Sequence, residues 1–172
     1  MITIVSATNR EGSITCKVAM LYSELLNQMS VNHQIFDLSY LPNDFIFSNF
    51  NDTSTDDFVN QIEQYIIKAD RFIVISPEYH GSYPGIFKAF IDCIGNDGIK
   101  HKKVALVGVS SGRAGNLRGL DHLSALFHHL RAEVYSYKPK ISLVHNLFNE
   151  QNVLDDSETL KLIQNQINGF LI

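Results

Sequence analysis

Three short stretches of this chain concentrate residue types that bind anions and flat polar rings. They read SATNREGSIT (residues 6–15), SPEYHGSYPG (residues 76–85) and SSGRAGN (residues 110–116), and we name them loop one, loop two and loop three. Each is rich in glycine or hydroxyl residues, and each follows an apolar run typical of a buried strand. Ligands of parallel sheets bind beyond the carboxyl ends of the strands. We therefore treat the three loops as one candidate site.

Loop one leads into the N-terminus of a predicted helix, where free backbone N–H groups and the helix dipole favour a phosphate. Thr8, Ser13 and Thr15 add hydroxyl donors, and Arg10 adds a guanidinium. The loop matches neither G-x-x-x-x-G-K-[ST] nor G-x-G-x-x-G, so it is neither a P-loop nor a dinucleotide fingerprint. The alternative, in which Ser13 only caps the helix and Arg10 is only solvated, stays open.

Loop two combines aromatic rings with close access to the backbone. Tyr79 and His80 supply the rings, Gly81 lets a ligand approach the main chain, and Pro84 suits the first turn of a following helix. We interpret Glu78 as structural, because a carboxylate at this position can accept hydrogen bonds from loop N–H groups.

Loop three offers the backbone N–H groups of a flexible turn, with Arg113 among its residues. Such a turn can donate hydrogen bonds to the carbonyl groups of a planar heterocycle. The alternative is an ordinary strand-to-helix turn in which Asn116 caps the next helix.

The elements that position these loops alternate along the chain. Apolar runs rich in β-branched residues predict strands, and apolar residues at helical spacing predict helices between them. The predicted strands are Ile2 to Ser6, His33 to Leu38, Arg71 to Ser76 and Lys102 to Ser110. The predicted helices have apolar faces at Val18 to Met29, Phe58 to Ala69, Ile86 to Ile94, Leu120 to Leu130 and Leu160 to Leu171. This alternation predicts an α/β fold, an open doubly wound sheet of about five mainly parallel strands with helices on both faces.

Local signals refine three parts of this outline. Ser54 and Asp57 form the pattern of a capping box at the start of one helix. The segment from Val134 to Val144 is β-rich but contains Pro139, which predicts an edge strand or a strand broken in two. The last helix is expected to begin near Ser157.

The composition fits a single domain that spans residues 1–172, because no linker, repeat or low-complexity segment divides it. A hydrophobic fraction of 45% is ordinary for a globular protein, and a formal net charge of -4 argues against a nucleic-acid partner. No apolar run approaches the roughly 20 residues of a membrane span, and the N-terminus lacks a signal-peptide pattern. Cys16 and Cys93 form no C-x-x-C pair and have no histidine at metal spacing. We expect a reduced, cytoplasmic protein with no metal site and no membrane partner.

Together, the three loops resemble those of the NADPH-dependent FMN reductase family, a flavodoxin-like group that includes quinone, azo-dye and chromate reductases. The match is strongest in loop two, which reads PEYHGSYPG against the family's P-E-Y-N-G-S-x-P-G and is followed by Lys88 and Asp92 at similar spacing. Loop one is similar to the family's G-S-x-R-x-x-S, with Arg10 and Ser13 in place. The resemblance implies a flavodoxin-like sheet with the strand order 2-1-3-4-5.

The resemblance also implies FMN as the cofactor and assigns three sets of residues to it. The FMN phosphate would be held by Thr8, Arg10, Ser13, Ile14 and Thr15. The isoalloxazine ring would be lined by Pro77, Glu78, Tyr79, His80, Gly81 and Ser82. Its pyrimidine side and the ribityl chain would face Ser110, Gly112 and Arg113.

This chain departs from the family pattern in all three loops. Ala7 and Thr8 stand where the family usually has Gly-Ser, and Arg113 and Ala114 are bulkier than the usual third loop. His80 replaces an asparagine, so the hydrogen bond offered beside the ring comes from an imidazole, a group that titrates near neutral pH.

The activity that the resemblance implies is that of an NAD(P)H-dependent reductase. NADPH or NADH would deliver hydride to flavin N5, and a small acceptor such as a quinone, an azo compound or free flavin would then take it up. No side chain is assigned as a catalytic acid or base, and donors such as Arg113 would stabilise negative charge on the reduced ring. The alternatives are a flavodoxin-like electron carrier, a class usually more acidic than this chain, and a non-catalytic binding module.

Assembly into a homodimer or homotetramer is also expected, because such oligomers are common in the resembled family. The stretch that contains Phe45, Ile46, Phe47 and Phe50 carries more aromatic surface than a loop usually exposes. It either faces another subunit, walls the substrate pocket or packs on its own domain.

Overall fold

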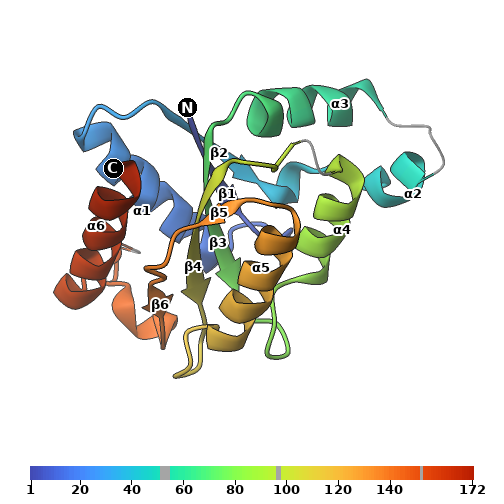
Figure 1. Cartoon of the computed structure of the whole chain (residues 1–172). Coiled ribbons are helices and arrows are strands. Elements are labelled where there is room, and N and C mark those ends of the chain that lie inside the picture. The colour runs from blue at the N-terminus through green and yellow to red at the C-terminus, as the bar shows by residue number, and fades with distance from the viewer. Residues whose placement is uncertain (51–54, 96–97, 152) are drawn as a thin grey trace.

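One six-stranded sheet organises the part of the chain that the computed structural model describes, which is residues 1–50, 55–95, 98–151 and 153–172 (Figure 1). Its strands are β1 (Ile2–Ser6), β2 (His33–Asp37), β3 (Arg71–Pro77), β4 (Lys103–Val109), β5 (Glu133–Val134) and β6 (Lys140–Ile141). The order is β2-β1-β3-β4-β5, and β6 also pairs with β4. All these pairings are parallel. The predicted fold class and strand order are therefore confirmed.

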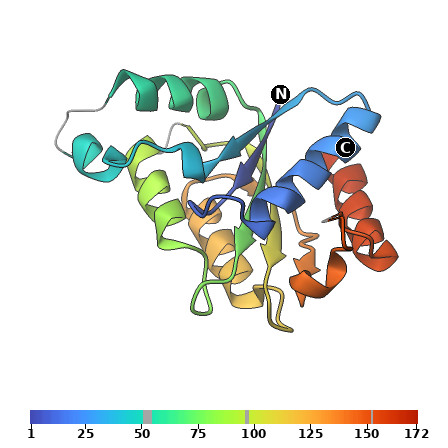
Figure 2. The same cartoon turned by 180° about the vertical axis from the view of Figure 1, so that it is seen from behind.

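Helices cover both faces of the sheet, as the two opposite views show (Figures 1 and 2). The α-helices are α1 (Ile14–Gln28), α2 (Phe45–Phe50), α3 (Asp56–Ile62), α4 (Gly85–Ile94), α5 (Leu117–His129) and α6 (Ser157–Leu171). Short 3-10 turns occupy η1 (Leu38–Tyr40) and η3 (Val144–Leu147), and one π-helical turn occupies η2 (Glu63–Ile67). Helices α1 and α6 pack on one face, whereas α3, α4 and α5 pack on the other. Two apolar cores result, one on each side of the sheet.

The parallel register brings the three loops to one edge of the sheet. All five residues of β1 are buried, as expected for a strand covered on both faces. Ser6 at the end of β1 pairs with Ile75, and Ser76 pairs with Gly108 of β4. Because β1, β3 and β4 end at nearly the same level, the loops that follow them are neighbours in space.

The structure corrects several predicted boundaries. Strand β2 ends at Asp37 instead of Leu38, because the Asp37 carboxylate accepts a hydrogen bond from the Ser39 N–H and starts a 3-10 turn. Strand β4 runs over Lys103–Val109, one residue shorter at each end than predicted. The segment with Pro139 is broken into β5 and β6, as one of the two predictions for it states.

The helix predicted between Phe58 and Ala69 begins differently and changes its winding. Thr55 is the N-cap, and its hydroxyl accepts a hydrogen bond from the Phe58 N–H at 3.3 Å. Ser54, the residue predicted to cap this helix, lies outside the described residues. The α-helix ends at Ile62 and continues as the π-helical turn η2. The last helix begins at Ser157 as predicted, with Asp156 as its cap.

The aromatic stretch near α2 packs partly on its own domain. Phe45 is buried and stacks on Phe58 with ring centroids 5.7 Å apart. Phe47 is 75% exposed. No helix within the described residues is both long and apolar enough to cross a membrane.

Candidate functional site

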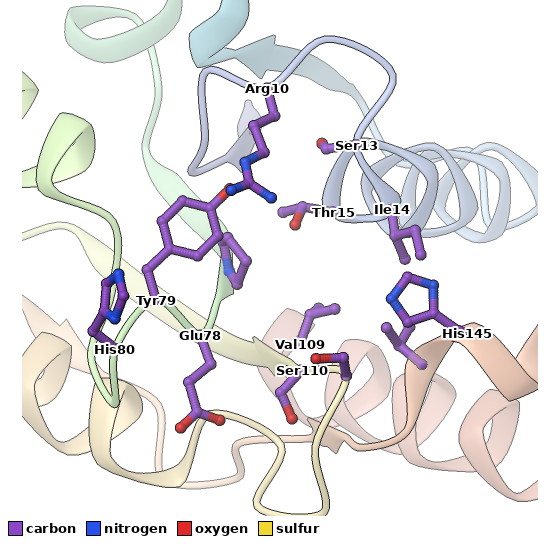
Figure 3. Close-up of a pocket in the computed structure, with 13 residues that line it drawn as sticks. Arg10, Ser13, Ile14, Thr15, Glu78, Tyr79, His80, Val109, Ser110 and His145 are labelled. Carbon is purple, nitrogen blue, oxygen red and sulfur yellow. The ribbon is translucent and has the colours of Figure 1, made fainter.

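A groove of about 420 Å³ lies where the three loops meet (Figure 3). It is lined by Arg10, Ser13, Ile14, Thr15, Pro77, Glu78, Tyr79, His80, Val109, Ser110, Ser111, Val144 and His145. These residues come from loop one, loop two, the end of β4 with loop three, and the turn η3 that follows β6. The groove thus sits beyond the carboxyl ends of the central strands, where ligands of open α/β sheets bind.

Loop one places a helix N-terminus and a cation at one end of the groove. Ser13 is the N-cap of α1, and its hydroxyl accepts a hydrogen bond from the Cys16 N–H at 3.1 Å. The first turn of α1 carries no acidic side chain, so no carboxylate within that turn offsets the positive end of the helix dipole. Arg10 is exposed and its guanidinium carbon lies 4.8 Å from the centroid of the Tyr79 ring. This end of the groove suits a phosphate group.

Loop two forms a tight hairpin that projects from the end of β3. Tyr79 and Ser82 exchange two backbone hydrogen bonds, of 2.9 and 3.0 Å. The two residues between them, His80 and Gly81, have φ angles of 52° and 75°. A type I′ turn requires positive φ at both central positions, and asparagine, histidine and glycine tolerate this better than most residues. The turn therefore explains why His80 can stand where the family has an asparagine.

The hydroxyl of Tyr79 ties loop two to loop one. It shares a hydrogen bond of 2.8 Å with the hydroxyl of Thr8, and either oxygen can donate. Thr8 is fully buried and does not line the groove. Its hydroxyl is therefore already used to hold Tyr79 beneath Arg10, as Figure 3 shows for the ring and the guanidinium.

Asn116 ties loop three to loop two, a role that the sequence did not reveal. Its side-chain amide donates to the Ser76 carbonyl at 3.0 Å and to the Pro77 carbonyl at 3.1 Å. Its backbone N–H donates to the Glu78 carboxylate at 3.3 Å. Asn116 occupies the N-cap position of α5, but its side chain makes no capping hydrogen bond. The predicted structural role of Glu78 agrees with this contact.

Loop three is also held internally and against β6. The Ser110 hydroxyl donates to the Gly112 carbonyl at 2.8 Å and accepts from the Gly115 N–H at 3.0 Å. The Ser110 N–H donates to the Ile141 carbonyl at 2.9 Å. Gly115 has a φ of 57°, and a methyl group added there would come within 2.6 Å of the Lys140 Cβ. The loop is therefore fixed by short contacts that leave little room for a larger residue.

The predicted site residues separate into those that line the groove and those that do not. The groove contains Arg10, Ser13, Ile14, Thr15, Pro77, Glu78, Tyr79, His80 and Ser110. The remaining predicted residues, which do not line it, are Thr8, Gly81, Ser82, Gly112 and Arg113. Ser82 instead bonds the Nδ1 atom of His122 at 2.8 Å, and Arg113 lies in the exposed part of loop three.

Four groove residues were not predicted from the sequence: Val109, Ser111, Val144 and His145. Val109 and Ser111 are the immediate neighbours of the predicted Ser110, so the prediction missed each of them by one residue. Val144 and His145 arrive through β6, a strand of only two residues whose length leaves no periodic signal in the sequence. In Figure 3 the His145 ring lies opposite Ile14 and closes the α1 side of the groove.

The thiol nearest the phosphate-suited end is held in its neutral form. Burial, together with a hydrogen bond to the Asp37 carboxylate and its negative charge, raises the pKa of Cys16 to about 12. A neutral thiol is a poor nucleophile, so Cys16 is a packing residue at this position. Within the described residues, no cluster of three or more His, Cys, Asp or Glu side chains is placed to hold a metal ion.

The donor set of the groove fits FMN. A phosphate matches the α1 N-terminus with its serine cap and the guanidinium of Arg10. A flat ring matches the other end, which is lined by Pro77, Tyr79, His80 and Ser110. The two ends belong to a single groove, so one molecule with a phosphate and a ring can occupy both.

Comparisons with known proteins agree with this arrangement. The model of the family described as NADPH-dependent FMN reductase matches residues 1–141. The FMN-dependent NADPH-azoreductase of Staphylococcus aureus (strain USA300) is 31% identical over 128 residues, which cover 72% of this chain and 66% of that protein. The corresponding enzyme of Staphylococcus haemolyticus is 29% identical over 126 residues, with the same coverages. The matched part thus spans just under two thirds of the length of these relatives.

Solved structures show the same fold. The flavoenzyme NAD(P)H:(acceptor) oxidoreductase FerB from Paracoccus denitrificans superposes with a TM-score of 0.79 at 22% identity, and covers 99% of this chain and 94% of its own. An oxidoreductase from Corynebacterium diphtheriae gives a TM-score of 0.78 at 20% identity, with coverages of 98% and 93%. At these low sequence identities the similarity to solved structures shows the fold alone. Membership of a family rests on the match to the family model. The chain therefore belongs to the NADPH-dependent FMN reductase family.

Proposed function

We propose that this chain is an NAD(P)H-dependent reductase that holds FMN in the groove between its three loops. The observation that carries the proposal is the groove itself, which joins a phosphate-suited helix N-terminus to an end lined by Pro77, Tyr79, His80 and Ser110 that suits a flat ring. Family membership and the activities for which the relatives are named support the same conclusion.

The residues of the three loops would divide the work of binding. Ser13, Thr15 and the first N–H groups of α1 would hold the phosphate, with Arg10 as its cation. The ring would lie against Pro77, Tyr79 and His80, with Ser110 on its other edge. Glu78 lines the same groove, and Thr8 supports Tyr79 through their shared hydrogen bond. Gly81 and Ser82 would support the site as part of the hairpin, and Gly112 and Arg113 as part of loop three.

The chemistry that FMN supplies when bound is the transfer of hydride from NADPH or NADH to a small acceptor such as a quinone, an azo compound or free flavin. The protein's own contribution is to position the charged groups around the ring and to stabilise negative charge on it. The Asn116 N–H holds the Glu78 carboxylate, so this charge is directed at loop three instead of the ring. Backbone N–H groups of loop three would stabilise negative charge on the ring edge that they face.

The test combines flavin binding with turnover. Purified protein should show the visible absorbance of oxidised flavin or acquire it with added FMN, and should then oxidise NAD(P)H in the presence of a quinone. Arg10→Gln should weaken FMN binding about tenfold through loss of a charge-assisted hydrogen bond. The same variant should leave riboflavin, which lacks the phosphate, bound as before. Lys161→Gln, on the exposed surface of α6, is the charge-matched control.

The outcomes separate the proposal from its rivals. Failure to bind FMN at all would refute it and favour a non-catalytic binding module. FMN binding without NAD(P)H oxidation would favour a flavodoxin-like electron carrier. An equal loss of FMN and riboflavin affinity in Arg10→Gln would show that the guanidinium does not act on the phosphate.

We also propose that the chain assembles as a homodimer or homotetramer in the reducing cytoplasm. Phe47, Val59 and Ile67 are 75%, 54% and 46% exposed, which is unusual for large apolar side chains on neighbouring elements. Cys16 and Cys93 are both free thiols. Light scattering behind size exclusion should give the mass of two or four chains, and a monomer mass at micromolar concentration would contradict the proposal.

A further inference from the structure

The first two turns of α5 lie against the tip of the loop-two hairpin. Arg118 and His122 are four residues apart, so their side chains share one face of the helix. The His122 Nδ1 atom and the Ser82 hydroxyl form a hydrogen bond of 2.8 Å. A methyl group added to Gly81 would lie 3.8 Å from both Nε and Cζ of Arg118. We call Ser82, Arg118 and His122 the hairpin-tip cluster.

The positive charge of Arg118 is not balanced by an ion pair within the described residues. In the described residues the ion pairs are those of the N-terminus with Asp70 and of Lys88 with Asp92, and neither involves Arg118. Two carboxylates come near the cluster in sequence, Asp121 beside His122 on the same helix and Glu78 four residues before Ser82, and Arg118 forms an ion pair with neither. Arg118 and His122 are both exposed, so a solute can reach them.

The cluster adjoins the groove through His80. This residue lines the groove and directly precedes Gly81, against which the Arg118 guanidinium lies. A molecule that stacks on a ring held beside His80 therefore has the cluster within reach of its distal part. Other cations near the sheet are differently placed. Arg10 lies over Tyr79 on the loop-one side, and Lys102 donates to the carbonyls of Ile66 and Ile67 far from the groove.

We infer that the hairpin-tip cluster binds the diphosphate of the NAD(P)H donor. This inference rests on the proposed function, because it needs a flavin in the groove for the nicotinamide to meet. A guanidinium offers two parallel N–H donors that match the oxygens of a phosphate. The hydrogen-bonded pair of Ser82 and His122 keeps one further donor on the same side, either the Ser82 hydroxyl or the His122 imidazole N–H, and Gly81 leaves the approach free of a side chain. A diphosphate is the anionic group common to NADH and NADPH, so the cluster serves both.

The kinetic test uses FMN-loaded protein and the variants Arg118→Gln and His122→Gln, with a neutral quinone as acceptor. Arg118→Gln should raise the KM for NADH and for NADPH about tenfold, with kcat changed by less than about twofold. His122→Gln should raise both KM values by about threefold, since it loses a neutral hydrogen bond. Lys161→Gln, which removes one positive charge from α6, should leave every value at that of the parent protein.

Equilibrium measurements complete the test and separate it from the proposed function. ADP-ribose, a redox-inert probe that carries the diphosphate, should bind FMN-loaded Arg118→Gln about tenfold more weakly by titration calorimetry. FMN titration of the same variants should match the parent, and absence of FMN binding in the parent would instead refute the proposed function. Unchanged KM values and unchanged ADP-ribose affinity would overturn the inference. A KM that rises for NADPH alone would overturn the inference and assign the cluster to the 2′-phosphate. A KM that rises only for a sulfonated azo acceptor would overturn it and assign the cluster to binding of the acceptor.

Discussion

The side chain of Asn116 offers a direct test of how loop three is locked to loop two. It is fully buried and donates hydrogen bonds of 3.0 and 3.1 Å to the carbonyls of Ser76 and Pro77. Its backbone is left-handed, with a φ of 61°. Asparagine tolerates this conformation better than alanine does, and glycine adopts it freely. Asn116→Gly and Asn116→Ala therefore remove the same amide but differ in backbone cost.

The magnitudes follow from these two features. Either variant loses two buried hydrogen bonds, at about 1 kcal/mol each, so Asn116→Gly should lower the free energy of unfolding by about 2 kcal/mol. Asn116→Ala should lose about 1 kcal/mol more, because a β-carbon in the left-handed region is strained. The expected order of stability is Asn, then Gly, then Ala. This reverses the usual order, in which alanine exceeds glycine in a helix by about 0.5–1 kcal/mol.

Urea unfolding measures both differences, and thermal unfolding should show midpoints lower by about 6 °C for glycine and about 9 °C for alanine. Asn27, exposed near the end of α1, supplies the matched pair of control variants, in which alanine should be the more stable. An Asn116→Ala protein at least as stable as Asn116→Gly would refute the argument from backbone conformation. A loss below about 0.5 kcal/mol in both would refute the argument from the two hydrogen bonds.

Three further predictions concern single contacts. Thr8→Val and Tyr79→Phe each break their shared 2.8 Å hydrogen bond, so a double-mutant cycle should give a coupling of about 1 kcal/mol in unfolding free energy. Because the pKa of Cys16 is raised to about 12, iodoacetamide at about pH 8.5 should modify it slowly, and Asp37→Asn should speed the reaction by lowering that pKa. Burial raises the pKa of Tyr22 well above its ordinary value of 10.0, so the unfolded chain releases this proton first and stability should fall as the pH rises above 10.0. Tyr22→Phe should remove that part of the alkaline loss in urea unfolding.

Each of these has a control within the chain. A coupling energy near zero between Thr8 and Tyr79 would show that the hydrogen bond between their hydroxyls contributes nothing to stability in solution. Cys93 is the internal reference for alkylation, because burial and the charge of Asp92 raise its pKa without help from Asp37. Its rate should not respond to Asp37→Asn, and an equal response would contradict the assignment. Tyr40, which is 75% exposed, gives the matching Phe variant, whose alkaline stability should follow that of the parent.

The fold was predictable because its strands are continuous apolar runs. In β1, β3 and β4 nearly every residue is buried, so burial itself leaves the signal that the sequence shows. The short strands β5 and β6 were seen only as one β-rich segment, because a two-residue strand has too few positions to show a period. The π-helical turn after Ile62 also left no signal, since its apolar residues continue the helical spacing.

The site was predictable as three loops but not as a set of contacts. Loop positions follow from strand ends, which explains why nine predicted residues line the groove. Gly81 and Ser82 belong to the family-like motif for a different reason: they complete a turn whose φ angles are positive at His80 and Gly81. A sequence motif shows which residues are required, but it does not show whether they bind a ligand or adopt a particular backbone conformation. Only the structure separates the two.

What the sequence could not show is how the loops depend on one another. The bond between Thr8 and Tyr79 joins residues 71 positions apart, and that between Asn116 and the Ser76 carbonyl spans 40 positions. Neither pair has a local pattern, because each hydrogen bond exists only once the parallel register has aligned the strand ends. Thr8 and Asn116 are buried behind the groove, so their hydrogen bonds fix the groove residues Tyr79 and Pro77 without a ligand. It follows that substitutions at Thr8 or Asn116 should weaken a ligand's binding without touching it, which distinguishes this interlocked arrangement from three independent loops.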